Sequence, residues 1–133
     1  LKLTEKFNRI RESEVRFEEV NTDDADYLLV AYGLSARIAQ KAMDLARAKG
    51  LRVGLLRPIT LFPFPEKRLR ELATQVQGML TVELNSGQMV EDVRLAVEGR
   101  VPVAHYGRMG GMIFTPEEIE RQLETLFEKA YAN

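Results

Sequence analysis

Two serines and the single histidine are the residues that could support nucleophilic catalysis. Ser35 and Ser86 could supply a hydroxyl nucleophile, and His105 could act as its base. On parallel sheets such a serine lies in a Gly-x-Ser-x-Gly turn, which exposes the hydroxyl at the end of a strand. Neither serine has this surrounding sequence. We therefore assign no catalytic residue to the chain.

Three arginines could hold an anion such as a phosphate or a carboxylate. Arg37, Arg57 and Arg108 lie near predicted strand ends, and the free N–H groups at a helix N-terminus favour the same ligands. The alternative is that the arginines pair with local carboxylates, of which Glu83 is one candidate. This plainer interpretation is the stronger one, because most such loops only connect elements.

The chain lacks the cysteines of thiolate metal sites and the glycine motifs of nucleotide-binding sites. The chain has no cysteine and one histidine, which excludes disulfides and cysteine-ligated clusters and argues against a zinc or haem centre. The segment AYGLS at 31–35 has one glycine where a dinucleotide fingerprint needs three, and no phosphate-loop lysine follows a glycine loop. Asp23 and Asp24 precede a predicted strand, so they do not match the acid pair of a receiver domain.

A stiff aromatic loop is the most distinctive segment. In GLLRPITLFPFP (54–65), three prolines end an apolar run and fix the conformation around Phe62 and Phe64. An apolar loop of this kind indicates a partner surface. The alternative, that one or both rings fold onto the core of the chain, is equally weighted.

A second loop combines glycines with methionine. The segment GRMGG (107–111) allows unusual backbone angles and could lie against a ligand or another chain. It could equally be a plain connection to the last helix.

Length and charge set the outer limits. A chain of 133 residues fits one domain, and its formal net charge of −1, with interspersed signs, argues against a nucleic-acid partner. No apolar run approaches the roughly 20 residues of a membrane-spanning helix, and no signal peptide is apparent, so we expect no membrane partner. The first residue is Leu1 instead of Met, which suggests a piece of a longer protein.

The elements that position these residues alternate regularly. Apolar runs predict inner strands at 27–31, 51–56, 79–84 and 101–106, and a charged edge strand at 16–20 follows a polar helix at 1–11. Helices are predicted between them. Their signals are Ser35 as a cap, Pro65 as a first residue, Gly87 as an opening residue, and the capping box that joins Thr115 to Glu118. Gly50, Gly78 and Gly99 are predicted to end the first three of these helices.

Each predicted helix has one apolar face that we expect to be buried. In chain order, these faces are Ile38, Ala42, Leu45 and Ala46; Leu69, Leu72, Ala73 and Val76; Met89, Val90, Val93, Ala96 and Val97; and Ile119, Leu123, Leu126 and Ala130.

Strands buried on both faces, each followed by a helix, predict a three-layer α/β/α domain. We expect a five-stranded, mostly parallel sheet with an antiparallel first strand at its edge. Residues 1–20 form the linker and edge strand, and 21–133 the α/β domain proper. Function in such sheets gathers at the carboxyl ends of the strands, where the loops 32–35, 57–64, 85–88 and 107–111 meet.

Several sequence blocks are distinctive when they are taken together and in order. They are LLVAYGLSAR (28–37), VGLLRPITLFPFP (53–65), VELNSGQMVEDVR (82–94), GRVPVAHYGRMGG (99–111) and FTPEEI (114–119). The chain thereby resembles the C-terminal domain of the alpha subunit of 2-oxoacid:ferredoxin oxidoreductases. The sequences of these blocks resemble those of the pyruvate and 2-oxoisovalerate types more than those of the 2-oxoglutarate type. Between the first two types, we favour the branched-chain (2-oxoisovalerate) type.

The resemblance implies a transketolase C-terminal-like fold with strand order 1-3-2-4-5. It also implies a cytoplasmic enzyme that decarboxylates a 2-oxoacid on thiamine diphosphate, passes electrons through 4Fe-4S clusters to ferredoxin, and forms an acyl-coenzyme A. The partners would be the beta subunit and the ferredoxin-like gamma or delta subunits. Thiamine diphosphate, magnesium and the clusters would lie on other domains or subunits, so this domain alone would not be catalytic.

The role that follows from the resemblance is assembly. The aromatic loop and the turn at 85–88 would pack against other domains near the thiamine site and the coenzyme A entrance. The residues that we expect at an interface or near a ligand are Arg57, Phe62, Phe64, Asn85, Gly87, Gln88 and Arg108.

Two alternatives remain open. The chain could be the C-terminal domain of a transketolase or of a 2-oxoacid dehydrogenase beta subunit. It could also be a stand-alone regulatory module that binds an anion at the strand ends.

Overall fold

The computed structural model describes residues 15–59, 64–84, 88–107 and 114–132, except for the side chains of Gln88 and of 127–132. Five strands and four helices alternate along this part of the chain. They are β1 (Phe17–Val20), β2 (Tyr27–Ala31), α3 (Leu34–Ala48), β3 (Val53–Pro58), α4 (Glu66–Leu72), β4 (Gly78–Glu83), α5 (Gln88–Val97), β5 (Val103–Gly107) and α6 (Pro116–Ala132).

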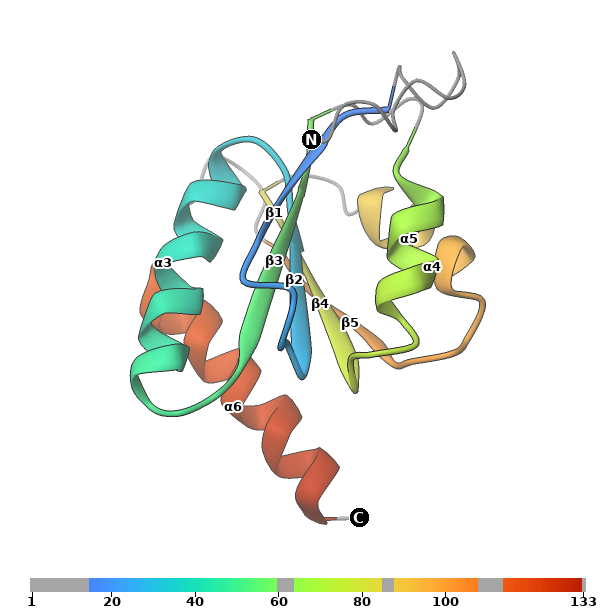
Figure 1. Cartoon of the computed structure of the whole chain (residues 1–133). Coiled ribbons are helices and arrows are strands. Elements are labelled where there is room, and N and C mark those ends of the chain that lie inside the picture. Colours follow the sequence, from blue (N-terminus) through green and yellow to red (C-terminus); the bar gives the residue numbers. More distant parts are fainter. Residues whose placement is uncertain (1–14, 60–63, 85–87, 108–113, 133) are drawn as a thin grey trace.

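The strands form one sheet in the order β1-β3-β2-β4-β5. The edge strand β1 runs antiparallel to β3, and the other neighbouring pairs are parallel. Helices α3 and α6 cover one face of the sheet, and α4 and α5 cover the other (Figure 1). The predicted three-layer architecture, the antiparallel edge strand and the strand order are confirmed.

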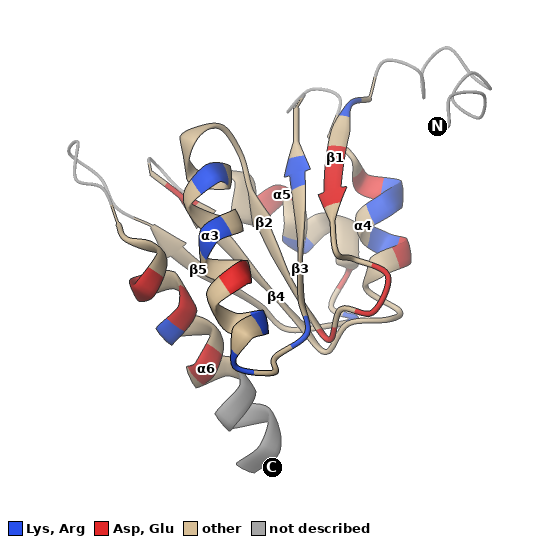
Figure 2. Ribbon diagram, turned by 60° about the vertical axis from the view of Figure 1, so that its left-hand side comes forward, with Lys and Arg blue, Asp and Glu red and all other residues tan. Residues whose placement is uncertain are grey.

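Burial on both faces explains why the inner strands are apolar. Every residue of β2 is buried, and its side chains alternate between the two cores. Leu29 and Ala31 pack with α3 and α6, whereas Leu28 and Val30 pack with α4 and α5. No charged residue marks β2, in contrast to β1 and the helices (Figure 2).

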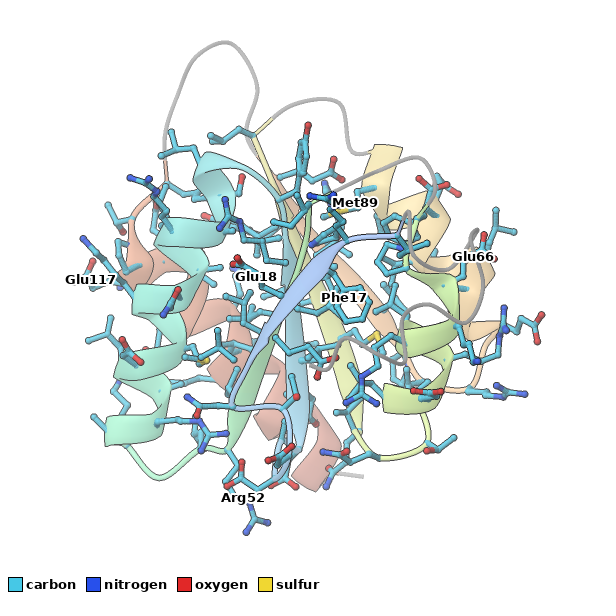
Figure 3. All side chains as sticks on the ribbon, turned by 45° about the horizontal axis from the view of Figure 1, so that its top comes forward. Phe17, Glu18, Arg52, Glu66, Met89 and Glu117 are labelled. Carbon is cyan, nitrogen blue, oxygen red and sulfur yellow. The ribbon has the colours of Figure 1, made fainter. Side chains whose placement is uncertain are left out.

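The charged edge strand is neutralised by ion pairs on both sides. Phe17 and Glu18 lie on opposite sides of β1, with Phe17 toward the core of α4 and α5 (Figure 3). Glu18 accepts a hydrogen bond from Arg57 Nη1 at 3.1 Å. Glu19 accepts two from Arg68 of α4, at 2.5 and 2.9 Å. The edge strand is therefore tied both to its neighbour strand and to a helix.

Helix α3 packs on the sheet through small residues. Its buried side chains include Ala36, Ala39, Ala42 and Ala46, which allow the helix backbone to lie close to the strands. Ile38 is partly buried, and Leu45, predicted to be inward, is 36% exposed. Leu45 therefore does not belong to the buried face of α3.

Helix α6 begins at the predicted capping box. Thr115 Oγ1 accepts the Glu118 N–H at 3.2 Å, and Glu118 Oε1 accepts the Thr115 N–H at 2.7 Å. Lys49 at the end of α3 donates to Glu120 and Glu124 at 3.0 and 2.6 Å. Burial, followed by the proximity of Glu124, raises the pKa of Glu120, whose side chain is 4% exposed.

Several predicted helix boundaries were wrong. Ser35 is not the cap of α3; Gly33 takes that position with φ of 65°, and Ser35 is buried in the first turn. Pro65 is the N-cap of α4 and not its first residue. That helix ends at Leu72, so Gly78 does not stop it but opens β4.

The remaining predictions concern the end of β3, the buried faces of the later helices and the N-terminal segment. Strand β3 extends past Leu56 to Pro58, because β1 supplies a partner at Phe17. The predicted buried faces of the later helices are confirmed at all the positions the structure describes except that Leu126 is only partly buried. The predicted helix at 1–11 lies outside the described residues, and the division at residue 20 stays a prediction.

We predict that Glu19→Gln lowers the free energy of unfolding by about 1 to 2 kcal/mol at pH 7, because it removes a charge-assisted pair. Burial alone would raise the pKa of Glu19, but hydrogen bonds from Arg68 and Thr22 outweigh it and lower the pKa. The contribution is therefore present above the unfolded pKa and is lost as pH falls through the folded pKa. Urea unfolding of both proteins from pH 7 to pH 3 should show the difference disappear on acidification.

The matched control is Glu71→Gln, since Glu71 pairs with the same Arg68 but its side chain is 52% exposed. Glu71→Gln should lower the free energy of unfolding by less than about 0.5 kcal/mol. Equal losses in the two variants would show that the Glu19 pair is an ordinary surface pair.

Candidate functional site

The carboxyl ends of the parallel strands form the candidate site. The described part of this edge includes Tyr32 to Ser35 after β2, Arg57 to Ile59 at the end of β3, Leu84 after β4, and Gly107 at the end of β5. Phe62, Asn85, Ser86, Gly87 and Arg108 lie outside the described residues. Gln88 is the first residue of α5, and its side chain is not described.

Arg57 lies on β3 opposite Glu18 of β1, and its guanidinium bonds Glu18 instead of the proposed partner Glu83. The Nε atom is buried and has no hydrogen-bond partner. Its side chain is 37% exposed. Arg57 therefore forms a local ion pair, as the plainer interpretation predicted, but its partner is Glu18 and not Glu83.

Phe64 packs inward. It is partly buried against the core between the sheet and α4 and α5. Its carbonyl accepts the N–H of Glu66 at 2.8 Å, which fixes the entry into α4. The sequence left open whether the rings of the aromatic loop contact a partner or pack onto the core of the chain. The Phe64 ring packs onto the core.

Glu83 occupies the N-terminus of α5. Its two carboxylate oxygens accept the Met89 N–H at 3.3 and 3.1 Å. A carboxylate at this position is stabilised by the free N–H groups and by the positive end of the helix dipole. The place that we considered for a bound anion therefore holds a carboxylate of the chain itself. Figure 3 labels Met89 at the start of α5.

His105 is held by neighbouring strand residues. Its Nδ1 lies 2.7 Å from the hydroxyl of the fully buried Thr81 and 4.0 Å from Glu83 Oε2. Gly107 leaves room for the ring, since a Cβ there would lie 2.8 Å from His105 Nε2. These contacts give His105 a structural role between β4 and β5.

The start of α3 also lies at this edge of the sheet. Among the described residues, Gly33 caps the helix with no side-chain hydrogen bond, and no acidic residue lies in the first turn. Arg37 is exposed, and we find no carboxylate within ion-pair distance in the part of the chain that the structure describes. Among the described residues, Arg37 is therefore an exposed cation beside the N-terminus of α3.

Sequence reasoning missed three exposed apolar residues at this edge. Tyr32, Leu34 and Ile59 are 44%, 52% and 42% exposed. The available signal was their position, because each directly follows a buried strand or opens a helix at the carboxyl edge. Without the tertiary structure, their hydrophobicity is indistinguishable from that of core residues.

Within the described residues, no group of three or more His, Asp or Glu side chains could hold a metal ion. The chain has no cysteine and so supplies no thiolate to an iron–sulfur cluster. None of the helices in the described ranges combines the length and apolar composition that a membrane span needs.

Residues 25–119 match the model of the family described as pyruvate:ferredoxin oxidoreductase core domain II. The ketoisovalerate oxidoreductase subunit VorB of Methanothermobacter thermautotrophicus is 51% identical over 128 residues, which are 96% of this chain and 35% of that protein. The chain thus spans about a third of the length of this relative.

Two solved structures share the fold. One is the 2-oxoglutarate:ferredoxin oxidoreductase from Magnetococcus marinus with 2-oxoglutarate, coenzyme A and succinyl-CoA bound (TM-score 0.73, 24% identity, 83% of this chain and 19% of that chain). The other is a split gene transketolase described as an inactive beta4 tetramer (TM-score 0.72, 20% identity, 83% and 40%). The expected likeness to transketolase domains is confirmed at the level of the fold.

We predict that Glu83→Ala destabilises the fold by about 1 kcal/mol, because it leaves the N-terminus of α5 without its carboxylate. Amide hydrogen exchange at Met89 should accelerate, and thermal unfolding should shift to lower temperature. Asp92→Ala, an exposed change in the same helix, should stay within about 0.5 kcal/mol of the parent. Unchanged exchange at Met89 in Glu83→Ala would contradict the capping role.

Proposed function

Since the chain belongs to the pyruvate:ferredoxin oxidoreductase core domain II family, we propose that it is an assembly domain of the alpha subunit of a cytoplasmic 2-oxoacid:ferredoxin oxidoreductase. The enzyme would oxidatively decarboxylate a 2-oxoacid, reduce ferredoxin and form an acyl-coenzyme A. The observation that carries this proposal is the 51% identity over 96% of the chain with a ketoisovalerate oxidoreductase subunit. We accordingly propose a branched-chain 2-oxoacid as the substrate class.

The geometry supports an assembly role for this domain. At the described part of the carboxyl edge, three polar side chains that could do chemistry have partners within the domain: Glu83 contacts the start of α5, Arg57 bonds Glu18, and His105 bonds Thr81. These internal contacts stabilise the fold. The domain would therefore contribute surface and position to the enzyme.

The cofactors belong elsewhere in this proposal. Thiamine diphosphate with its magnesium ion would lie on other domains or subunits, and so would the cysteines that ligate the 4Fe-4S clusters, because the present sequence has no cysteine. The beta subunit and a ferredoxin-like subunit are the proposed partners, and coenzyme A is a co-substrate of the complex.

One further candidate has a specific observation in its favour. The transketolase match shows that the same fold serves in another enzyme class. Its identity to this chain is 20%, against 51% for the ketoisovalerate oxidoreductase subunit, so the oxidoreductase is the better supported proposal.

Purification of the full-length alpha subunit with its natural partners tests the proposal. We expect bound thiamine diphosphate and iron, together with coenzyme A-dependent reduction of viologen by 2-oxoisovalerate. Pyruvate and 2-oxoglutarate are the comparison substrates, and a preference for either would revise the substrate class. A complex that lacks iron and does not oxidise any of the three would refute the oxidoreductase.

The aromatic loop provides a second test of the assembly role. We predict that Phe62→Ala in the full complex weakens subunit or domain association about 30-fold, since truncating an interface anchor typically costs about 2 kcal/mol or more. Native mass spectrometry across a dilution series would measure this. Phe64→Ala is the comparison variant: because Phe64 packs inward, it should lower thermal stability more than association. Unchanged association and turnover in Phe62→Ala would contradict the role of the loop.

A further inference from the structure

Three of the exposed large apolar residues of the described chain gather at one edge of the sheet. Tyr32 and Leu34 follow β2, and Ile59 follows β3. Strands β2 and β3 are neighbours, with Val30 opposite Leu56, so the chain segments beyond these two residues leave the sheet side by side. We call Tyr32, Leu34 and Ile59 the carboxyl-edge patch.

The polypeptide enters the domain at this same edge. Because β1 is antiparallel to β3, its first residue Phe17 lies opposite Pro58, at the carboxyl end of β3. The Ile59 N–H donates to the Arg16 carbonyl at 2.8 Å. Any chain that precedes residue 15 therefore reaches the domain beside the patch, whereas α6 runs to the opposite end of the sheet (Figure 1).

The length of the relatives indicates what could cover the carboxyl-edge patch. This chain accounts for 35% of the VorB sequence that it matches, which leaves about two thirds of that polypeptide to form other domains. A domain on the same polypeptide is present at a high effective concentration, on the order of millimolar for a short linker. A domain on the same polypeptide can therefore dock through a smaller apolar surface than a free partner needs.

We propose that the carboxyl-edge patch docks the part of the full-length subunit that precedes this domain. This inference rests on the proposed function, because it requires the chain to be the C-terminal domain of a longer alpha subunit. The surface that covers the patch would be apolar at its centre and acidic at its margin, since Arg37 lies beside the patch in the first turn of α3 and is exposed. Interdomain surfaces are commonly of this mixed kind.

Site-specific photocrosslinking in the full-length subunit, assembled with its partners, tests the proposal. A benzophenone amino acid replaces Tyr32 in one protein and Leu95 in the control. Leu95 of α5 is 73% exposed and lies in the opposite helix layer. Mass spectrometry of the crosslinked peptides should find links from position 32 to residues that precede this domain in the same polypeptide, and none of that kind from position 95.

A second substitution makes the readout specific to the patch. Adding Leu34→Asp should reduce the intrachain crosslink yield from position 32 at least tenfold, whereas adding Leu95→Asp should leave it unchanged. Links from position 32 only to another subunit, or no links in an assembled complex, would overturn the docking proposal. Activity of the same preparation is read separately, so an inactive complex with the expected links would refute the proposed function and leave the docking intact.

Discussion

Two-sided burial of β2 is the constraint on which the rest of the structure depends. All five residues of this strand are buried, and both of its neighbours are parallel to it. A parallel strand with apolar side chains on both faces needs a helix layer on each side and crossover connections between strands. Parallel direction also brings the ends of β2, β3 and β4 to the same edge. The location of any site follows from this arrangement.

The edge strand shows how the sheet is closed on one side. An unpaired strand edge is a template for aggregation, and charged side chains reduce that risk. In β1 the two acidic residues are also used structurally, because Glu18 pairs with a strand and Glu19 with α4. The antiparallel direction of β1 has a further consequence: it brings the incoming chain to the carboxyl edge.

The polar groups at that edge illustrate the difference between a residue type and its role. A glutamate, a histidine and a threonine lie together on β4 and β5, with His105 Nδ1 2.7 Å from Thr81 and 4.0 Å from Glu83. In another setting such a group could transfer a proton. Here the glutamate caps α5 and the histidine bonds the buried threonine, so the satisfied contacts indicate a structural cluster. In the described part of this edge, the outward apolar residues and the exposed Arg37 are what the domain presents to other surfaces.

Sequence alone determined the architecture, because it depends on local patterns. Four apolar runs, a charged first strand, and a capping box that joins Thr115 to Glu118 were sufficient for the layers, the edge strand and the start of α6. Helix ends were less predictable, since Gly78 can stop a helix or open a strand, and only the pairing of β2 with β4 selects the second. The resemblance carried by the ordered sequence blocks supplied the strand order, which periodicity does not encode.

Tertiary structure decided which partner each edge residue has. The choice of Glu18 over Glu83 for Arg57 depends on the register between β1 and β3, a contact across 39 positions of sequence. The exposure of Tyr32, Leu34 and Ile59 likewise depends on which elements cover the carboxyl edge. Composition and spacing record hydrophobicity and local conformation, but burial is a property of the assembled surface. The sequence therefore determined where a site would lie, and only the fold decided which residues are free to form it.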